Sequence, residues 1–71
     1  MRLTQRTAEY WRTMGADDAD ADRARGLAYS TLTTRYPGDL AGLPPCAVAM
    51  ASTWFDEGYV RRLEQRAWGR L

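Results

Sequence analysis

Three aspartates that alternate along the chain, Asp18, Asp20 and Asp22, come nearest to a known ligand-binding pattern. Alternating aspartates open the calcium-binding loop, which also needs glycine at its sixth position and glutamate at its twelfth. Those positions hold Arg23 and Tyr29, so the sequence does not encode a calcium loop. We interpret the aspartates as an acidic, solvated helix start, where carboxylates favour the positive end of the helix dipole.

The remaining nucleophilic and acidic residues lack the partners that catalysis requires. Cys46 follows two prolines, but a nucleophilic cysteine needs a base, and the chain has no histidine. Asp56 and Glu57 are adjacent and would point about 100° apart on a helix, so they do not form a catalytic pair. Glu57 is better placed to pair with Arg61 four residues later. Because no glycine-rich phosphate loop is present either, we expect no catalytic activity, metal or cofactor.

A row of arginines near the end of the sequence is a candidate binding feature. Arg62, Arg66 and Arg70 recur every four residues and would line one side of a helix. Such a row can follow a phosphate backbone or an acidic protein groove, or be an ordinary solvated face. Aromatic side chains beside arginines are typical of protein-binding surfaces. The candidate partner-binding residues are therefore Trp54, Phe55, Tyr59, Arg62, Arg66, Trp68 and Arg70.

Helical spacing of apolar residues predicts the elements that position these side chains, and no segment alternates with the period of a strand. A first helix is expected from Gln5 to Met14, capped by Thr4 and ended by Gly15. A second is expected to begin after Asp17 or Asp18 and to end before the turn at Pro37 and Gly38. Its predicted buried stripe is Ala24, Leu27, Ala28, Thr31 and Leu32.

The last third of the sequence predicts a helix over 45–57 that starts apolar on every side, followed by a helical segment over 59–68. The apolar face of the first projects onto Arg62 and Arg66, whereas the second has a different apolar stripe. We therefore predict a kink or break near Gly58. An unbroken helix would be about 36 Å long and would favour a dimer. The second stripe consists of Tyr59, Val60, Leu63 and Ala67.

Length and composition place these elements in one all-α domain over residues 1–71, a small bundle of three to four helices. A chain this short buries a limited core, and its single cysteine cannot form an internal disulfide, so we expect a dimer or a partner-bound protein. No apolar run is long enough to span a membrane, and no signal peptide is recognisable. An unpaired cysteine agrees with a cytoplasmic location.

The charge composition narrows the origin and the function. Net charge is +1, which gives no overall attraction to nucleic acid. All ten basic residues are arginine, and isoleucine and asparagine are absent, which indicates a GC-rich bacterial genome or a phage or mobile element within one. The sequence favours a non-catalytic protein–protein interaction module acting as a small regulator, adaptor or inhibitor. The alternative is a nucleic-acid-binding accessory protein that uses the arginine row.

Overall fold

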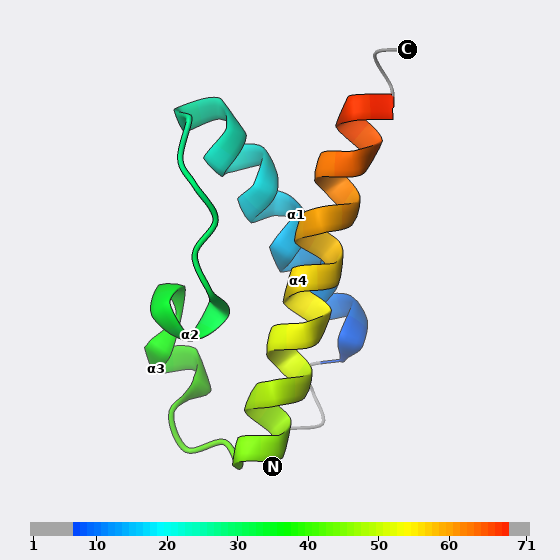
Figure 1. Ribbon diagram of the computed structural model, residues 1–71. Coiled ribbons are helices and arrows are strands. Elements are labelled where there is room, and N and C mark those ends of the chain that lie inside the picture. The colour runs from blue at the N-terminus through cyan, green and yellow to red at the C-terminus, as the bar shows by residue number, and fades with distance from the viewer. Residues whose placement is uncertain (1–6, 69–71) are drawn as a thin grey trace.

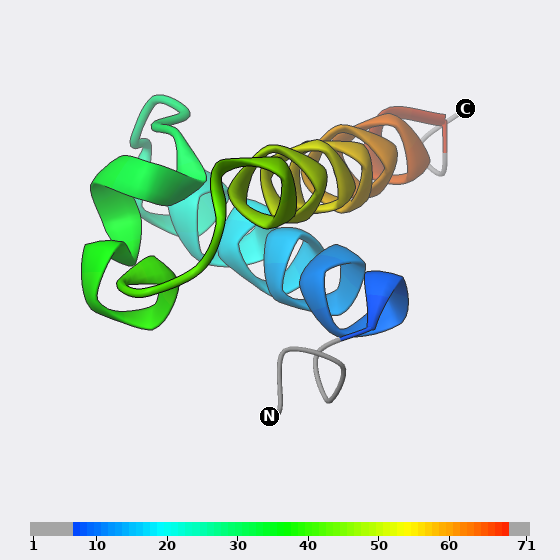
Figure 2. The ribbon, with the colours of Figure 1, turned by 90° about the horizontal axis from the view of Figure 1, so that it is seen from below.

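The computed structural model describes residues 7–68 and is mostly helical, with no strand in that range. Two long helices, α1 (Ala8–Arg25) and α4 (Pro45–Trp68), cross and then diverge (Figure 1). The connection between them contains two single-turn helices, α2 (Leu32–Arg35) and α3 (Pro37–Leu40). It covers one side of the helix pair (Figure 2). The predicted all-α class is confirmed, in the form of a helix pair with short additional helices.

Helix α1 begins later and ends later than the sequence predicted for its first helix. The Thr7 hydroxyl accepts a hydrogen bond from the Tyr10 amide at 3.3 Å and caps the start, whereas the predicted cap, Thr4, lies outside the described residues. The predicted end at Gly15 is wrong, because α1 continues through it to Arg25. Gly26 ends the helix instead, in the left-handed conformation that glycine adopts without strain.

The second helix predicted from the sequence is wrong in both its start and its buried stripe. The aspartates belong to the body of α1, and the chain leaves the helix at Gly26 and has no helix again before α2. Leu32 is fully buried, but the other members of the predicted stripe are exposed. Thr31 caps α2 by accepting a hydrogen bond from the Thr34 amide. The exposed members are Ala24, Leu27, Ala28 and Thr31.

The predicted kink or break near Gly58 is also wrong, because α4 is continuous over its 24 residues. Gly58 is buried at the crossing with α1, and a Cβ atom built on it would overlap the carbonyl oxygen of Arg12. The arrangement is reciprocal, since a Cβ on Gly15 would overlap the carbonyl oxygen of Phe55. The two glycines therefore let the two helix backbones approach each other closely.

The core is small and lies mainly between α1, α4 and the connection. The molecule is elongated, with extents of 44 × 20 × 15 Å, and its radius of gyration of 12.8 Å exceeds the roughly 11 Å of a compact chain of this length. No helix within residues 7–68 combines the length and hydropathy needed to cross a membrane. The buried apolar residues are Trp11, Ala19, Leu32, Leu40, Ala51, Phe55 and Tyr59.

Candidate interaction surface

A buried carboxylate joins the three main parts of the fold. Asp22 on α1 is 4 % exposed and accepts hydrogen bonds from both terminal guanidinium nitrogens of Arg35 on α2. It also accepts a hydrogen bond from the Tyr59 hydroxyl on α4, at 2.8 Å. Arg35 donates through its Nε to the carbonyl oxygen of Ser30, at 3.1 Å. This cluster fixes the connection against both long helices, and no buried side-chain polar atom of the described residues lacks a partner.

The same cluster shifts several proton equilibria. Hydrogen bonds from Arg35 and Tyr59 hold the pKa of Asp22 below its ordinary value, against the opposing effect of burial. The Tyr36 hydroxyl donates to both carboxylate oxygens of Asp18, at 2.8 and 3.1 Å. Burial, followed by hydrogen bonding to carboxylates, raises the pKa values of Tyr29, Tyr36 and Tyr59. These groups are therefore held in one protonation state and are not poised to exchange protons near neutral pH.

The tyrosines of the cluster should make the protein sensitive to alkali. The neutral forms of Tyr36 and Tyr59 are favoured in the folded state, so their contribution to stability is present below their ordinary pKa of 10.0. It is lost as the pH rises above that value, because the unfolded chain then releases protons that the folded chain retains. We expect the absorbance of ionised tyrosine to appear at a higher pH in the native protein than in the protein unfolded in urea. Identical titration curves would contradict the burial and hydrogen bonding of Tyr36 and Tyr59.

The side chain of Asp20 lies on a different side of α1 from that of Asp18, since residues two apart lie about 200° apart around a helix. Its carboxylate accepts a hydrogen bond from Nη1 of Arg62 at 2.5 Å, and two more from Nε and Nη2 of Arg66 at 3.2 and 3.1 Å. Both arginines lie where the apolar face of α4 projects past Gly58. The same side of α4 therefore contacts α1 along its length, through apolar packing before Gly58 and through ion pairs after it. For this reason α4 can remain continuous.

The candidate partner-binding residues fall into different environments. Phe55 is completely buried, Tyr59 is 5 % exposed, and Trp54 is partly buried against the core. Arg62 and Arg66 bind Asp20, as described above. The two other candidates, the Trp68 side chain and Arg70, lie outside the part of the chain that the structure describes. The structure therefore places the central aromatic candidates inside the chain's own fold.

The pairing predicted for Glu57 is also different from the one observed. Its carboxylate accepts a hydrogen bond from Nε of Arg12 on α1, at 3.0 Å, so it bridges the two helices. Within the described residues, Arg61 has no hydrogen bond or ion pair. Spacing along one helix favours Arg61 as the partner, but the crossing of α1 brings Arg12 within reach of Glu57.

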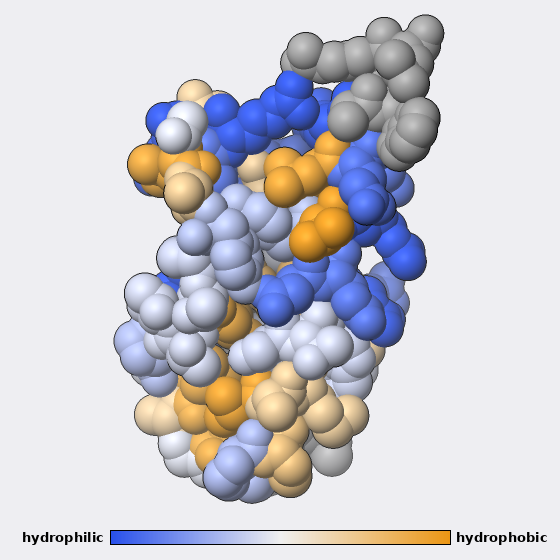
Figure 3. Space-filling view, viewed as in Figure 1, coloured by the Kyte–Doolittle hydropathy of each residue, from blue (hydrophilic) through white to orange (hydrophobic). Residues whose placement is uncertain are grey.

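The side chains that remain exposed include several large apolar ones. Val60 is 50 % and Leu63 37 % exposed on α4, and Leu27 is 54 % and Tyr29 42 % exposed in the connection. The Tyr29 ring packs edge-on against that of Tyr59, with centroids 4.8 Å apart, on the same stretch of α4 as Val60 and Leu63. We call Tyr29, Val60 and Leu63 the α4 apolar surface. Figure 3 shows hydrophobic residues exposed over this half of α4.

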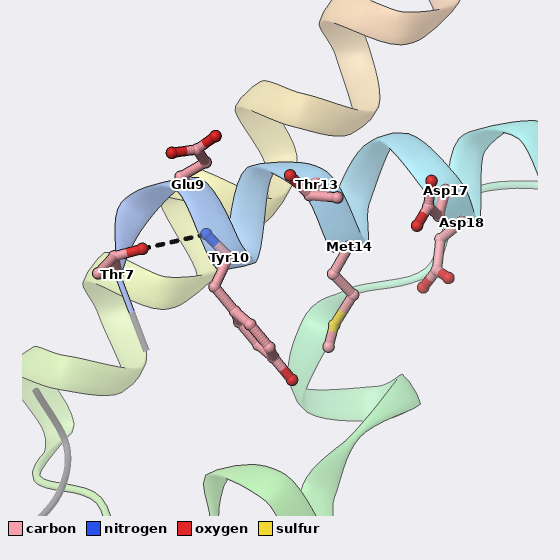
Figure 4. A pocket seen from close by; sticks show the side chains of 7 residues that line it. All are labelled: Thr7, Glu9, Tyr10, Thr13, Met14, Asp17 and Asp18. Carbon is pink, nitrogen blue, oxygen red and sulfur yellow. Dashed lines mark hydrogen bonds between the residues drawn. The ribbon is translucent and has the colours of Figure 1, made fainter. Parts of the chain in front are cut away.

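A separate depression of about 530 Å³ lies along the first part of α1. Tyr10 and Met14 point from the same side of the helix, and acidic residues, including Asp17 and Asp18, complete the lining (Figure 4). Asp18 is engaged by Tyr36, as described above. Nowhere in residues 7–68 do three histidine, cysteine, aspartate or glutamate side chains converge as a metal ion would require. Cys46 is exposed in the first turn of α4.

The fold and its polar cluster define a small all-α protein in which two glycines bring a helix pair together and a buried carboxylate holds the connection in place. No protein-family model, curated protein or solved structure matches this chain. Sequence reasoning pointed to Val60 and Leu63 through the second apolar stripe of α4. It missed Leu27, which the predicted stripe places in the core, and it did not single out Tyr29.

Proposed function

We propose that this protein is a non-catalytic interaction module that binds another polypeptide through the α4 apolar surface. The observation that carries the proposal is the exposure of Val60 and Leu63 on a helix whose opposite side is buried against α1. Covering a large apolar side chain contributes about 1.5–3 kcal/mol when it is fully exposed, and about half of that here. A charged neighbour, Glu64, would form part of the polar rim that surrounds most protein interfaces.

A second copy of the chain is the partner we propose first. The unbroken helix α4 is about 36 Å long and gives the molecule an elongated shape with a small core. In a twofold interface between two such helices, the same patch of each subunit is covered. The total apolar area buried would therefore be twice the area that one chain contributes. In this role the protein would act as a small regulator, adaptor or inhibitor of bacterial, phage or mobile-element origin.

Charged residues on the α4 apolar surface should disrupt the dimer. We expect Val60→Asp and Leu63→Asp each to weaken self-association at least about tenfold, because each places a charge in an apolar contact. Sedimentation or light scattering at micromolar concentration measures the effect. Met50→Asp is the matched control, since Met50 is 52 % exposed on α4 and lies about 15 Å from Val60 along the helix.

Two results would contradict this proposal in different ways. A wild-type chain that is folded and strictly monomeric would exclude the homodimer and require a different protein as partner. Equal weakening by Met50→Asp and Val60→Asp would exclude the α4 apolar surface as the contact. Circular dichroism of each variant separates loss of association from loss of folding.

The alternative function, nucleic-acid binding, depends on the arginine row and receives less support. Asp20 already engages the guanidinium groups of Arg62 and Arg66, which reduces the positive charge available to phosphates. A nucleic-acid-binding role would show itself as binding that weakens steeply with salt. Protein binding is the better-supported proposal because Val60 and Leu63 are exposed apolar side chains that lie outside the buried core.

A further inference from the structure

A small hollow between α1 and α4 gathers positive charge from both helices. It has a volume of about 220 Å³, and Arg12 of α1 lines it together with Arg61, Arg62 and Gln65 of α4. Gly58 also lines it, where the two helix backbones approach most closely. Glu57 is the only carboxylate among the residues that line the hollow, and Asp20 binds Arg62 from outside it, so three positive charges are met by two negative ones and the hollow keeps a net positive charge.

Many of the hydrogen-bond donors around this hollow are unused within the described residues. Arg12 bonds to Glu57 through Nε, which leaves its two terminal nitrogens, and Arg62 bonds to Asp20 through Nη1, which leaves Nε and Nη2. Arg61 has no hydrogen bond or ion pair within the same range. The carboxylates thus orient two of the three guanidinium groups without consuming their donors.

The size and chemistry of the hollow indicate what it would accept. Pockets for drug-sized molecules have volumes of about 300–1,000 Å³, so this hollow is suited to a smaller group. Guanidinium groups bind carboxylates and phosphates through paired N–H donors, and several of them around one point favour an anion with more than one charge. The arginines of the hollow come from two helices, so a ligand must accept hydrogen bonds from more than one direction. A phosphate group can do so through its several oxygens.

We propose that this hollow is a binding site for a phosphate group, either free phosphate or a small phosphate monoester. Arg61 would supply the uncompensated charge, Arg12 and Arg62 their remaining N–H donors, and the Gln65 side chain a further donor. The site faces a different side of α4 from Leu63, because Arg61 and Gln65 are each two residues from Leu63 and therefore about 200° around the helix from it. Phosphate binding thus goes beyond the proposed protein interaction and does not depend on it.

Titration with inorganic phosphate at constant ionic strength tests the site. We expect phosphate, and not an equivalent concentration of chloride, to shift the NMR signals of Arg12, Gly58 and Arg61. Arg61→Gln should weaken phosphate binding roughly tenfold, since one charge-assisted hydrogen-bonding group is lost. Arg23→Gln is the matched control: it removes the same charge from an exposed position of α1 outside the hollow, and it should change the affinity less than about twofold.

Arg61 is exposed and has no ion pair in the described part of the chain, so Arg61→Gln should fold normally, which circular dichroism checks. Equal weakening by Arg61→Gln and Arg23→Gln would overturn the proposal, as would signal shifts that chloride reproduces. A parallel titration with phosphoserine distinguishes the two sources of the group. Tighter binding than inorganic phosphate at the same residues assigns a monoester, and weaker binding assigns the free ion.

Discussion

Replacing Gly58 by alanine is expected to destabilise the protein by about 3 kcal/mol or more, although alanine is the better helix former. The new Cβ would overlap the carbonyl oxygen of Arg12 and lie within 2.7 Å of its Cα and carbonyl carbon. All three are backbone atoms, so no side-chain rotation can relieve the overlap. Helices α1 and α4 would have to separate, and the core between them would lose contacts.

Urea unfolding of Gly58→Ala against the wild type measures this cost. Gly38→Ala is the matched control, because a Cβ at Gly38 meets nothing within 4 Å, and its effect should stay within about 0.5 kcal/mol. Stabilisation of Gly58→Ala by up to about 1 kcal/mol, as helix propensity alone predicts, would show that the backbones are not in close contact at this point.

Gly15→Ala tests the same crossing from the other helix. Its Cβ would overlap the carbonyl oxygen of Phe55 and approach the Tyr59 amide to 3.0 Å, so a similar loss of stability is expected. Once one substitution has forced the helices apart, the second has more room. The double variant should therefore lose less stability than the two single losses added together.

The glycines also show how far local sequence signals reach. Gly15 and Gly26 look alike as possible helix ends, yet only Gly26 ends α1, with a positive φ of 70°. The difference is tertiary, since Gly15 is in α1 at the point where the backbone of Phe55 passes. Helical periodicity was sufficient to predict the all-α class, but the distinction between a helix end and a helix crossing depends on a residue 40 positions away along the chain.

The apolar pattern of α4 was read correctly but interpreted wrongly. The face that packs on α1 does project onto Arg62 and Arg66, and these arginines do lie on the α1 side, where Asp20 binds them. The change from apolar residues to arginines on one face suggested a break. Their partner, Asp20, precedes the arginines by 42 residues or more and could not be identified from local spacing. Continuity of a helix is therefore compatible with a change from apolar packing to ion pairs along one face.

The polar cluster had one detectable signal in the sequence. Asp18 and Asp22 are four residues apart and share a face of any helix that contains both, so they can reach common partners. Their interpretation as a solvated helix start depended on a helix end at Gly15, which the structure excludes. The partners Arg35 and Tyr36 follow a non-helical connection whose path the sequence does not determine.

Removing the guanidinium of the cluster is the second change with a large expected effect. Arg35→Met keeps an unbranched side chain but leaves the buried carboxylate of Asp22 without its cationic partner. Arg35 and Asp22 are largely buried, with side chains 17 % and 6 % exposed, so screening by water is limited. Loss of one member of a buried ion pair typically costs 3–5 kcal/mol. We expect about 3 kcal/mol, because the Tyr59 hydroxyl still donates to Asp22.

The pH dependence of this loss separates the ion pair from simple packing. In the wild type the pKa of Asp22 is held below its ordinary value of 3.8, so its stabilising contribution is present above that pH and disappears as the pH falls through the lowered pKa. In Arg35→Met the carboxylate has lost the cation that is hydrogen-bonded to it, and its protonation in acid relieves the cost of burying its charge. The difference in unfolding free energy between the two proteins should therefore be large at neutral pH and shrink in acid.

Urea unfolding at neutral pH and below pH 4 measures this convergence, with Arg23→Met as the control. Arg23 is exposed in the last turn of α1, so its loss should have a small effect at both pH values. A difference for Arg35→Met that is the same in acid as at neutral pH would mean that the side chain acts through its aliphatic contacts. The connection would then be held by packing of Leu32 and Tyr36, and the carboxylate of Asp22 would be incidental to it.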